Sequence, residues 1–383
     1  MKLNPDMLEA MRKATSLLQS ARPNDATGKI ARVLQRVLPG AAAMTSVATQ
    51  RSPMKNINPP PAATPAGNVP DFVADLLQRF GTPGTTGGIA FPLSQASPRC
   101  DAPHGQFLSG AITNAAGSRQ YKLYVPQAYH GQKLPLVVML HGCTQNPDDF
   151  AAGTEMNQQA ELTPCLVLYP AQSSRANSSK CWNWFNAIDQ QRERGEPSII
   201  ADMTREIIAT YAIERSQVYI AGLSAGGAMA AIMGHAYPEL YAAVGIHSGL
   251  PYAAANDLSS ALQAMRAGAS AARNAPPVGA SRPIIVFHGD RDHTVHPRNG
   301  EQLIAQHVSA NTRASVEQGT VAGGHKFTRT LHRDQAGIAV AEQWLIHGAG
   351  HAWSGGSSNG TYTDRHGPHA TREMMRFFAT RRD

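Results

Sequence analysis

The sequence predicts an α/β protein whose central sheet is mostly parallel and carries helices on both faces. From residue 136 onward, short continuous apolar runs alternate with segments of helical periodicity. Such runs are typical of parallel strands that are buried on both sides. The segment 218–229 shows one complete unit of this alternation, an apolar β-branched run, a glycine-flanked turn and a helix. We therefore expect a series of strand–helix units, in which each helix leads the chain back to the start of the next parallel strand.

Each element follows from its own pattern. Segments 107–113 and 119–125 precede the parallel region and are joined by the turn-forming residues 114–117, which predicts an antiparallel pair. The further predicted strands are 136–140, 166–169, 218–221, 244–247, 284–287 and 343–346. The predicted helices are 149–161, 199–211, 226–237, 300–310 and a closing helix at 371–379. The alanine-rich segment 253–280 is either a helical cap beside the functional site or a surface insertion.

Three regions are expected along the chain. Residues 1–38 predict a small helical hairpin, with apolar positions at helical spacing within 4–38. Residues 39–104 form a linker rich in proline and glycine, with one short amphipathic helix at 71–80. Residues 105–383 form the compact domain. Two short helices bury little apolar surface by themselves, so residues 4–38 are expected to contact the main domain, another subunit or an apolar surface.

Composition excludes several classes of protein. The 383 residues carry a net charge of +7, but the basic residues are scattered, which does not favour nucleic-acid binding. No apolar run approaches the roughly 18 residues of a membrane span, and no secretory signal is visible, so we expect a cytoplasmic protein on sequence alone. The four cysteines are not spaced as a zinc site. His347 and His351 have a metal-ligand spacing but flank a glycine-rich loop, so we expect no metal site and no cofactor.

A G-x-S-x-G motif at Gly222–Leu223–Ser224–Ala225–Gly226 provides the candidate nucleophile. Its strand–turn–helix setting is that of a nucleophile elbow, in which small neighbours let strand and helix approach closely. The serine then stands before the helix N-terminus, where the N–H of Ala225 and the helix dipole stabilise a developing oxyanion. The alternative is a glycine-rich turn without chemistry.

A serine nucleophile needs a base and an orienting acid, each at the end of a later strand. Asp292 and Asp290 compete as acid after the strand 284–287; Asp292 is favoured because Val295 follows at a spacing that returns the chain to the core, whereas Asp290 suits a turn brace. His351, which follows the strand 343–346, is the candidate base, with His347 as the alternative. These predictions together form a Ser224–Asp292–His351 triad.

The other predicted site residues lie on loops after earlier strands. His141-Gly142 follows the strand 136–140, so the backbone N–H of Cys143 is expected to complete the oxyanion hole with that of Ala225. Trp182 and Trp184 follow the strand 166–169 and are interpreted either as walls of an acyl pocket or as buried core aromatics. Trp353, close to His351, is a third candidate for substrate binding.

These motifs resemble those of the poly(3-hydroxybutyrate) depolymerase-type esterases, relatives of feruloyl and acetylxylan esterases. The resemblance covers about residues 105–380 and rests on the segments 119–126, 140–145, 181–185, 222–229, 288–292 and 350–356. It implies an α/β-hydrolase fold, the triad named above and an ester substrate. It also suggests a disulfide between Cys143 and Cys181, and an extracellular location in place of a cytoplasmic one, because such enzymes are often secreted.

The resulting hypothesis is a serine esterase that hydrolyses hydroxyalkanoate polymer or oligomers. An enzymatic alternative keeps the triad and changes the substrate to feruloyl or acetyl esters on plant polysaccharide. An alternative of another class is a granule- or partner-binding protein in which residues 4–38 are the functional part and the hydrolase domain is a relict. We expect no separate substrate-binding module after the catalytic domain.

Overall fold

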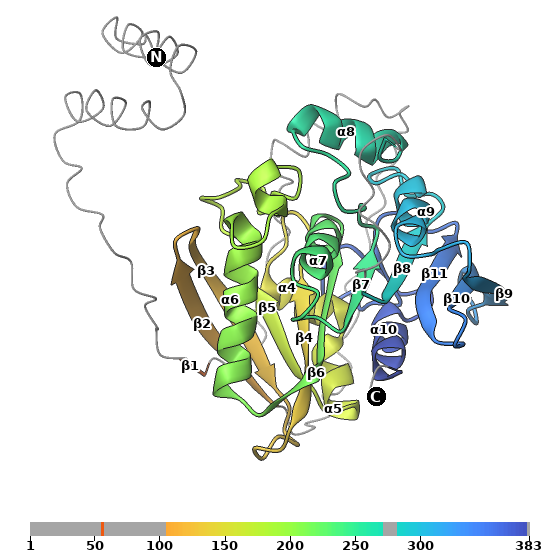
Figure 1. Cartoon of the computed structure of the whole chain (residues 1–383). Helices are drawn as coiled ribbons and strands as arrows, with labels where there is room; N and C mark the ends of the chain where they lie inside the picture. Colours follow the sequence, from red (N-terminus) through yellow and green to blue (C-terminus); the bar gives the residue numbers. More distant parts are fainter. Residues whose placement is uncertain (1–54, 57–104, 271–281, 381–383) are drawn as a thin grey trace, which may run out of the picture. The chain divides into compact units, whose positions relative to one another are not determined.

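A computed structural model describes residues 55–56, 105–270 and 282–380 (Figure 1). Within these residues the chain forms an eleven-stranded sheet in the order β1-β2-β3-β5-β4-β6-β7-β8-β11-β10-β9. The strands are β1 (Lys55–Asn56), β2 (Gln106–Asn114), β3 (Gly117–Val125), β4 (Leu134–Leu140), β5 (Leu166–Pro170), β6 (Ile213–Leu223), β7 (Ala243–His247), β8 (Ile284–Gly289), β9 (Arg313–Thr320), β10 (Lys326–Arg333) and β11 (Ala339–His347). A separate two-stranded pair joins β12 (Trp353–Ser354) to β13 (Thr363–Asp364).

The centre of the large sheet is parallel and its two margins are antiparallel. Strands β5, β4, β6, β7, β8 and β11 pair in parallel, whereas β1, β2 and β3 on one side and β10 and β9 on the other pair antiparallel. This confirms the predicted mostly parallel sheet. Because the central strands run the same way, their carboxyl ends meet at one edge, where loops from distant parts of the chain come together.

Helices cover both faces of the sheet. They are α4 (Pro147–Thr154), α5 (Met156–Leu162), α6 (Gly195–Thr210), α7 (Ala225–Ala236), α8 (Leu258–Ala267), α9 (Arg298–Ala305) and α10 (Ala370–Ala379), with a short 3-10 helix η1 at Ala187–Gln190. Residues of α6, α7, α8 and α9 pack in one apolar cluster, and residues of α4, α5 and α10 pack in another. Figure 1 shows α6 and α7 in front of the strands.

Strands β4 and β6 alternate between these two clusters residue by residue. Leu136 and Val138 of β4 pack in the first cluster, whereas Val137 and Met139 pack in the second. Successive side chains of a strand point to opposite faces, so a strand covered on both sides needs an apolar residue at every position. This is why the central strands appear in the sequence as unbroken apolar runs.

Several boundaries differ from those expected. The predicted helix 149–161 is two helices, because Glu155 adopts a left-handed φ of 55° between α4 and α5. Asn146 begins α4 by accepting a hydrogen bond from the N–H of Asp149, with a proline next in the chain. Helix α9 ends at Ala305 instead of 310, and β6 begins five residues before 218.

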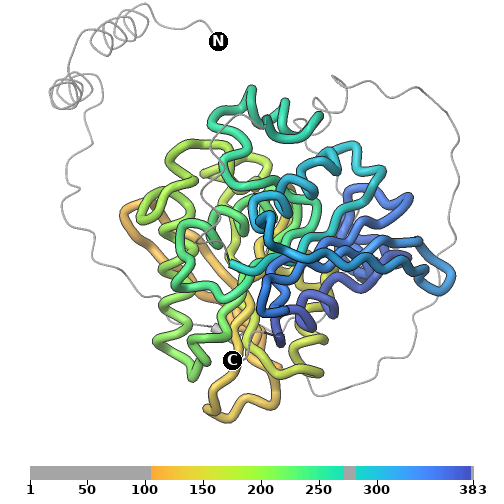
Figure 2. Tube along the Cα trace, turned by 45° about the vertical axis from the view of Figure 1, so that its right-hand side comes forward, coloured from red at the N-terminus to blue at the C-terminus, as the bar shows by residue number. Residues whose placement is uncertain are grey.

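The hairpin of β9 and β10 has no counterpart among the sequence predictions. It forms the margin of the sheet beyond β11 and projects from it in Figure 2. All but one residue of β9 are exposed, so the strand lacks the apolar pattern by which a strand is recognised. The predicted hairpin 4–38 and helix 71–80 lie outside the described residues, and of the predicted linker only β1 is described, as a two-residue strand on β2.

Candidate active site

Ser224 stands at the sharp turn between β6 and α7. Its backbone has φ 56° and ψ −120°, a conformation that L-residues rarely adopt and that marks stored strain. A Cβ atom at Gly222 would lie 2.4 Å from the carbonyl carbon of Gly226, and one at Gly226 would lie 2.1 Å from the carbonyl oxygen of Leu140. Both glycines of the motif are therefore required by close backbone contacts, and the second also brings α7 against the end of β4.

The candidate acid and base meet on adjacent loops. Nδ1 of His351 lies 2.7 Å from Oδ2 of Asp292. The other oxygen, Oδ1, accepts hydrogen bonds from the backbone N–H groups of Thr294 and Val295, at 2.9 and 2.8 Å. The Val295 side chain is fully buried, in line with the spacing argument that favoured Asp292 over Asp290. His351 thus presents its second ring nitrogen, Nε2, away from the acid.

The Asp292 carboxylate stays ionised although it is buried. Burial acts to raise the pKa of Asp292, but hydrogen bonds from His288 and His351 outweigh it and hold this pKa well below its ordinary value. Nε2 of His288 lies 3.4 Å from Oδ2 of Asp292 and 2.8 Å from the carbonyl oxygen of Val295. A negative charge is therefore fixed beside His351, where it stabilises an imidazolium.

The two alternative residues form a second, more exposed pair. Oδ2 of Asp290 lies 3.0 Å from Nδ1 of His347, and Oδ1 accepts from the N–H of Gly348 at 2.7 Å. Nε2 of His347 lies 2.9 Å from the hydroxyl of Thr328 on β10, so both of its ring nitrogens are engaged. Asp290 thus braces the acid loop against the base loop, whereas the sequence had suggested an Asx-type hydrogen bond within its own turn.

Ser224 is fixed through its backbone, and its hydroxyl makes no hydrogen bond to His351 among the described residues. The N–H of Ser224 donates to the carbonyl oxygen of His247, the last residue of β7, at 2.9 Å. Hydrogen bonds between nucleophile and base are often long without substrate and tighten in the reacting complex. The structure therefore places the acid and the base in contact, and the nucleophile at the end of β6, which β7 separates from β8 in the sheet.

The two backbone donors expected for the oxyanion hole are unengaged. Among the described residues, the N–H groups of Cys143 and Ala225 donate to no protein acceptor, whereas those of Gly142, Thr144 and Ser224 do. The N–H of Thr144 donates to Ser179 O, and that of Gly142 donates to Oε1 of Gln145. The N–H of Ala225 is free because it begins α7, and the N–H groups at a helix N-terminus favour an anion; the free N–H of Cys143 is a second donor on the loop after β4.

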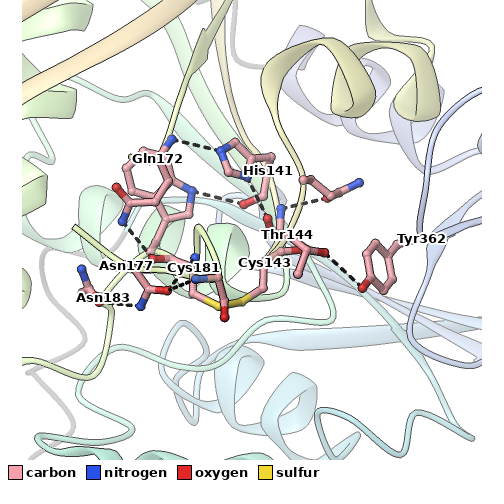
Figure 3. Close-up of a disulfide and its surroundings, with 12 residues drawn as sticks. His141, Cys143, Thr144, Gln172, Asn177, Cys181, Asn183 and Tyr362 are labelled. Carbon is pink, nitrogen blue, oxygen red and sulfur yellow. Dashed lines mark hydrogen bonds between the residues drawn. A yellow bond between two sulfur atoms is a disulfide. The ribbon is translucent and has the colours of Figure 1, made fainter. Parts of the chain in front are cut away.

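The loop that carries Cys143 is held from several sides (Figure 3). Cys143 and Cys181 form a disulfide, as the family resemblance suggested. Nδ1 of the buried His141 donates to the carbonyl oxygen of Gly142, and its Nε2 accepts from the N–H of Gln172 at 3.1 Å. Burial lowers the pKa of His141 to about 4, so this arrangement of a neutral ring holds at neutral pH.

All three tryptophans named as substrate-binding candidates are buried in this structure. Trp182 is fully buried and donates its indole N–H to the carbonyl oxygen of His141, and Trp184 packs in the same apolar cluster. Trp353 is buried between Phe150 and His247 and donates to the hydroxyl of Thr371. Their burial favours the interpretation of Trp182 and Trp184 as core aromatics. Trp353 is a core aromatic residue by the same criterion.

His247 was not singled out from the sequence, yet it contacts Ser224, the loop of His351 and the strand that leads to Asp292. Besides accepting from Ser224, it accepts at Nε2 from the N–H of Ser354, three residues after His351, at 3.0 Å. Its ring also stacks on Phe287 of β8, the strand that leads to Asp292. His247 lies at the end of a buried strand, as Ser224 and His288 do, and this position in the sequence could have marked it as a candidate site residue.

Segment 253–280 is helical in part. Helix α8 packs through two buried alanines, and its Met265 accepts a backbone hydrogen bond from His296 on the loop after Asp292, while residues 271–281 lie outside the described part.

In residues 105–270 and 282–380, no group of three or more His, Cys, Asp or Glu side chains is placed to hold a metal ion. None of the described helices is long and apolar enough to cross a bilayer.

Comparison with known proteins identifies the family. The family model described as Esterase PHB depolymerase matches residues 119–327, which is more than half of the chain. The chain belongs to this family. The match begins on β3 and runs into β10, so it includes Ser224 and Asp292 but ends before His351.

Individual relatives and a solved structure agree with this assignment. Poly(3-hydroxyalkanoate) depolymerase C of Paucimonas lemoignei is 31% identical over 62% of this chain and 59% of its own length. The probable acetylxylan esterase A of Aspergillus fumigatus is 30% identical over 54% of this chain and 60% of its own. The chain thus spans about three fifths of these relatives. The solved acetyl xylan esterase from Aspergillus awamori shares the fold, with a TM-score of 0.52 and 18% identity over 68% of this chain and 94% of that one.

Proposed function

We propose that this protein is a serine esterase that cleaves carboxylic esters through an acyl-enzyme on Ser224. The observation that carries the proposal is the 2.7 Å contact between His351 and the buried, ionised Asp292, at the same sheet edge as the strained Ser224. Membership of the Esterase PHB depolymerase family supports it. The proposed catalytic groups are all side chains or backbone N–H groups of this chain.

The proposed reaction proceeds in two halves. His351 takes the Ser224 proton at Nε2 while Asp292 holds Nδ1–H and stabilises the imidazolium, and Ser224 Oγ attacks the ester carbonyl. The free N–H groups of Cys143 and Ala225 hydrogen-bond the resulting oxyanion, and loss of one such donor typically costs about 10²–10³ in rate. The alcohol leaves with the proton from His351. Water, activated by the same histidine, then releases the acid.

For the substrate, we infer a hydroxyalkanoate polyester or its oligomers. The depolymerase from Paucimonas lemoignei supports this inference, since it shares 31% identity with this chain across 253 residues. The acetylxylan esterase relative, 30% identical across 230 residues, and a feruloyl esterase B relative, 28% identical across 210 residues, favour acetyl or feruloyl esters on polysaccharide as the second candidate. Both candidates require the same triad and differ in the groups that surround the ester.

The test offers amorphous poly(3-hydroxybutyrate), acetylated xylan and methyl ferulate to the purified protein, with Ser224→Ala as blank. Release of 3-hydroxybutyrate or its oligomers by the wild type alone supports the polyester substrate. Release of acetate or ferulate alone moves the protein to the second candidate. Turnover by Ser224→Ala at the wild-type rate would rule out the acyl-enzyme mechanism.

A further inference from the structure

Tyr362 is an exposed aromatic residue on the loop that follows the candidate base. Its side chain is 41% exposed, although tyrosine has a large apolar ring. Its carbonyl oxygen accepts a hydrogen bond at 2.7 Å from the N–H of Trp353, two residues after His351. The ring is therefore carried by the same loop as His351.

The hydroxyl of Tyr362 reaches the loop that carries the proposed oxyanion donor. It lies 3.2 Å from the hydroxyl of Thr144, the residue after Cys143, as Figure 3 shows. Thr144 uses its own proton on the carbonyl oxygen of Cys143 at 2.6 Å, so Tyr362 is the donor in this contact. The hydrogen-bond chain from Tyr362 through Thr144 to Cys143 joins the base loop to the oxyanion loop.

Both hydroxyl-bearing residues have strained backbones. Thr144 has φ 66° and Tyr362 has φ 53°, values at which side chains with a Cβ are disfavoured. The strain is held by Thr361, which accepts from Nε2 of Gln145 at its carbonyl oxygen and donates from N–H and hydroxyl to the carboxylate of Asp149. Such strain persists where the surroundings fix it, and an observed outlier of this kind points to function.

We propose that Tyr362 determines substrate specificity. Its ring forms one wall of the substrate site and contacts the apolar part of the ester, while its hydroxyl fixes that wall to the oxyanion loop. This rests on the proposed esterase function and names a residue that contacts its substrate. Tyrosine suits the role, because it offers a large rigid apolar area with one polar end that finds a hydrogen bond.

The experiment measures kcat/KM of the full chain and of Tyr362→Phe and Tyr362→Ala on two series of soluble esters. One series lengthens the acyl group from acetate to octanoate on p-nitrophenol, and the other varies the alcohol of a fixed acyl group. Apolar contacts discriminate between substrates by about tenfold or more. We expect Tyr362→Ala to change the long-to-short ratio at least about fivefold in one series, and Tyr362→Phe, which keeps the ring but loses the hydrogen bond to Thr144, to change it less than Tyr362→Ala does.

Controls separate this proposal from the others. Leu162→Ala removes an exposed apolar side chain that precedes β5, at the opposite end of the strands, and should leave both ratios unchanged. If Tyr362→Ala does not fold, Tyr362→Asn replaces it, because asparagine tolerates a positive φ. Labelling of Ser224 by a fluorophosphonate reports on the esterase proposal independently. Unchanged ratios in both series, with Ser224 still labelled, would overturn the role of Tyr362 alone.

Discussion

Asp290 and Asp292 lie two residues apart on one loop, but their surroundings assign them different roles. Asp292 is buried, accepts two backbone N–H groups and contacts His351, whereas Asp290 pairs with His347 at the surface. We expect Asp292→Asn to lower kcat about 10³–10⁴-fold, because the amide no longer holds the imidazole in the required state. Asp290→Asn should lower it less than about tenfold, since an exposed pair contributes little. Steady-state kinetics on a soluble ester compare the two, and equal losses would contradict the assignment.

The buried histidines predict a loss of stability in mild acid. Burial lowers the pKa of His141 to about 4 and that of His247 to about 3. In the unfolded chain both histidines take up protons near pH 6.5, while in the folded protein they do not. The free energy of unfolding therefore falls as the pH drops below about 6.5. For His141 alone the shift corresponds to about 3 kcal/mol once the pH is below 4.

Urea unfolding at pH 7.5, 6.5, 5.5 and 4.5 measures this dependence. The range above pH 4.5 separates the histidines from most carboxylates, whose ordinary pKa values lie near 4. His141→Gln, which keeps one donor and one acceptor, should reduce the slope of unfolding free energy against pH. An unfolding free energy that is constant between pH 6.5 and 4.5 in the wild type would show that these rings are not held neutral.

At the scale of elements, the packing of α7 against β4 depends on Gly226. A methyl group at Gly226 would meet the carbonyl oxygen of Leu140 at 2.1 Å, and this oxygen belongs to the backbone and cannot rotate away. We expect Gly226→Ala to displace α7 from the loop of Cys143, lower the melting temperature and reduce kcat at least about tenfold. Gly350→Ala is the matched control, because an added Cβ there has no atom within 4 Å. Similar effects of the two variants would mean that the close approach is not required.

The disulfide fixes the loop after β4 to the loop after β5. Cys143 and Cys181 are 38 residues apart, and closing a loop of that length stabilises a folded chain by about 4 kcal/mol. We expect Cys181→Ser to lower the melting temperature and, because Cys143 also carries the proposed oxyanion donor, to lower kcat. Thermal unfolding and kinetics with and without reductant test this, and reductant should have no effect on the variant. A variant as stable and active as the wild type would contradict the role given to the disulfide.

The sequence predicted the elements whose burial produces a regular apolar pattern along the chain. Central strands show as apolar runs because both of their faces are buried, and Asp292 was preferred because Val295 returns to the core. Strand β9 was missed because its exposed residues carry no pattern. The contacts of His247 and the Tyr362–Thr144 hydrogen bond were also missed, because they join residues 107 and 218 positions apart and no local pattern encodes such pairs.

At the scale of the molecule, the parallel centre of the sheet assembles the site. Ser224, Asp292 and His351 follow β6, β8 and β11, whose carboxyl ends lie at one edge although 127 positions separate the first residue from the last (351 − 224). The proposed oxyanion donor at Cys143 follows β4, the neighbour of β6. Every group of the proposed reaction therefore comes from residues 105–380.

This arrangement predicts that the chain without residues 1–70 remains an esterase. The proposed triad, the oxyanion donors and the apolar clusters all lie beyond residue 105, and the deletion removes from the described sheet only the two-residue strand β1. We expect kcat/KM on a soluble p-nitrophenyl ester to stay within about twofold of the full chain, since no catalytic contact is lost. The polymer assay on the same two proteins then reports on residues 1–70, which include the predicted hairpin 4–38. Loss of polymer hydrolysis with soluble activity intact indicates that they bind the polymer, whereas loss of soluble activity would contradict a self-sufficient catalytic domain.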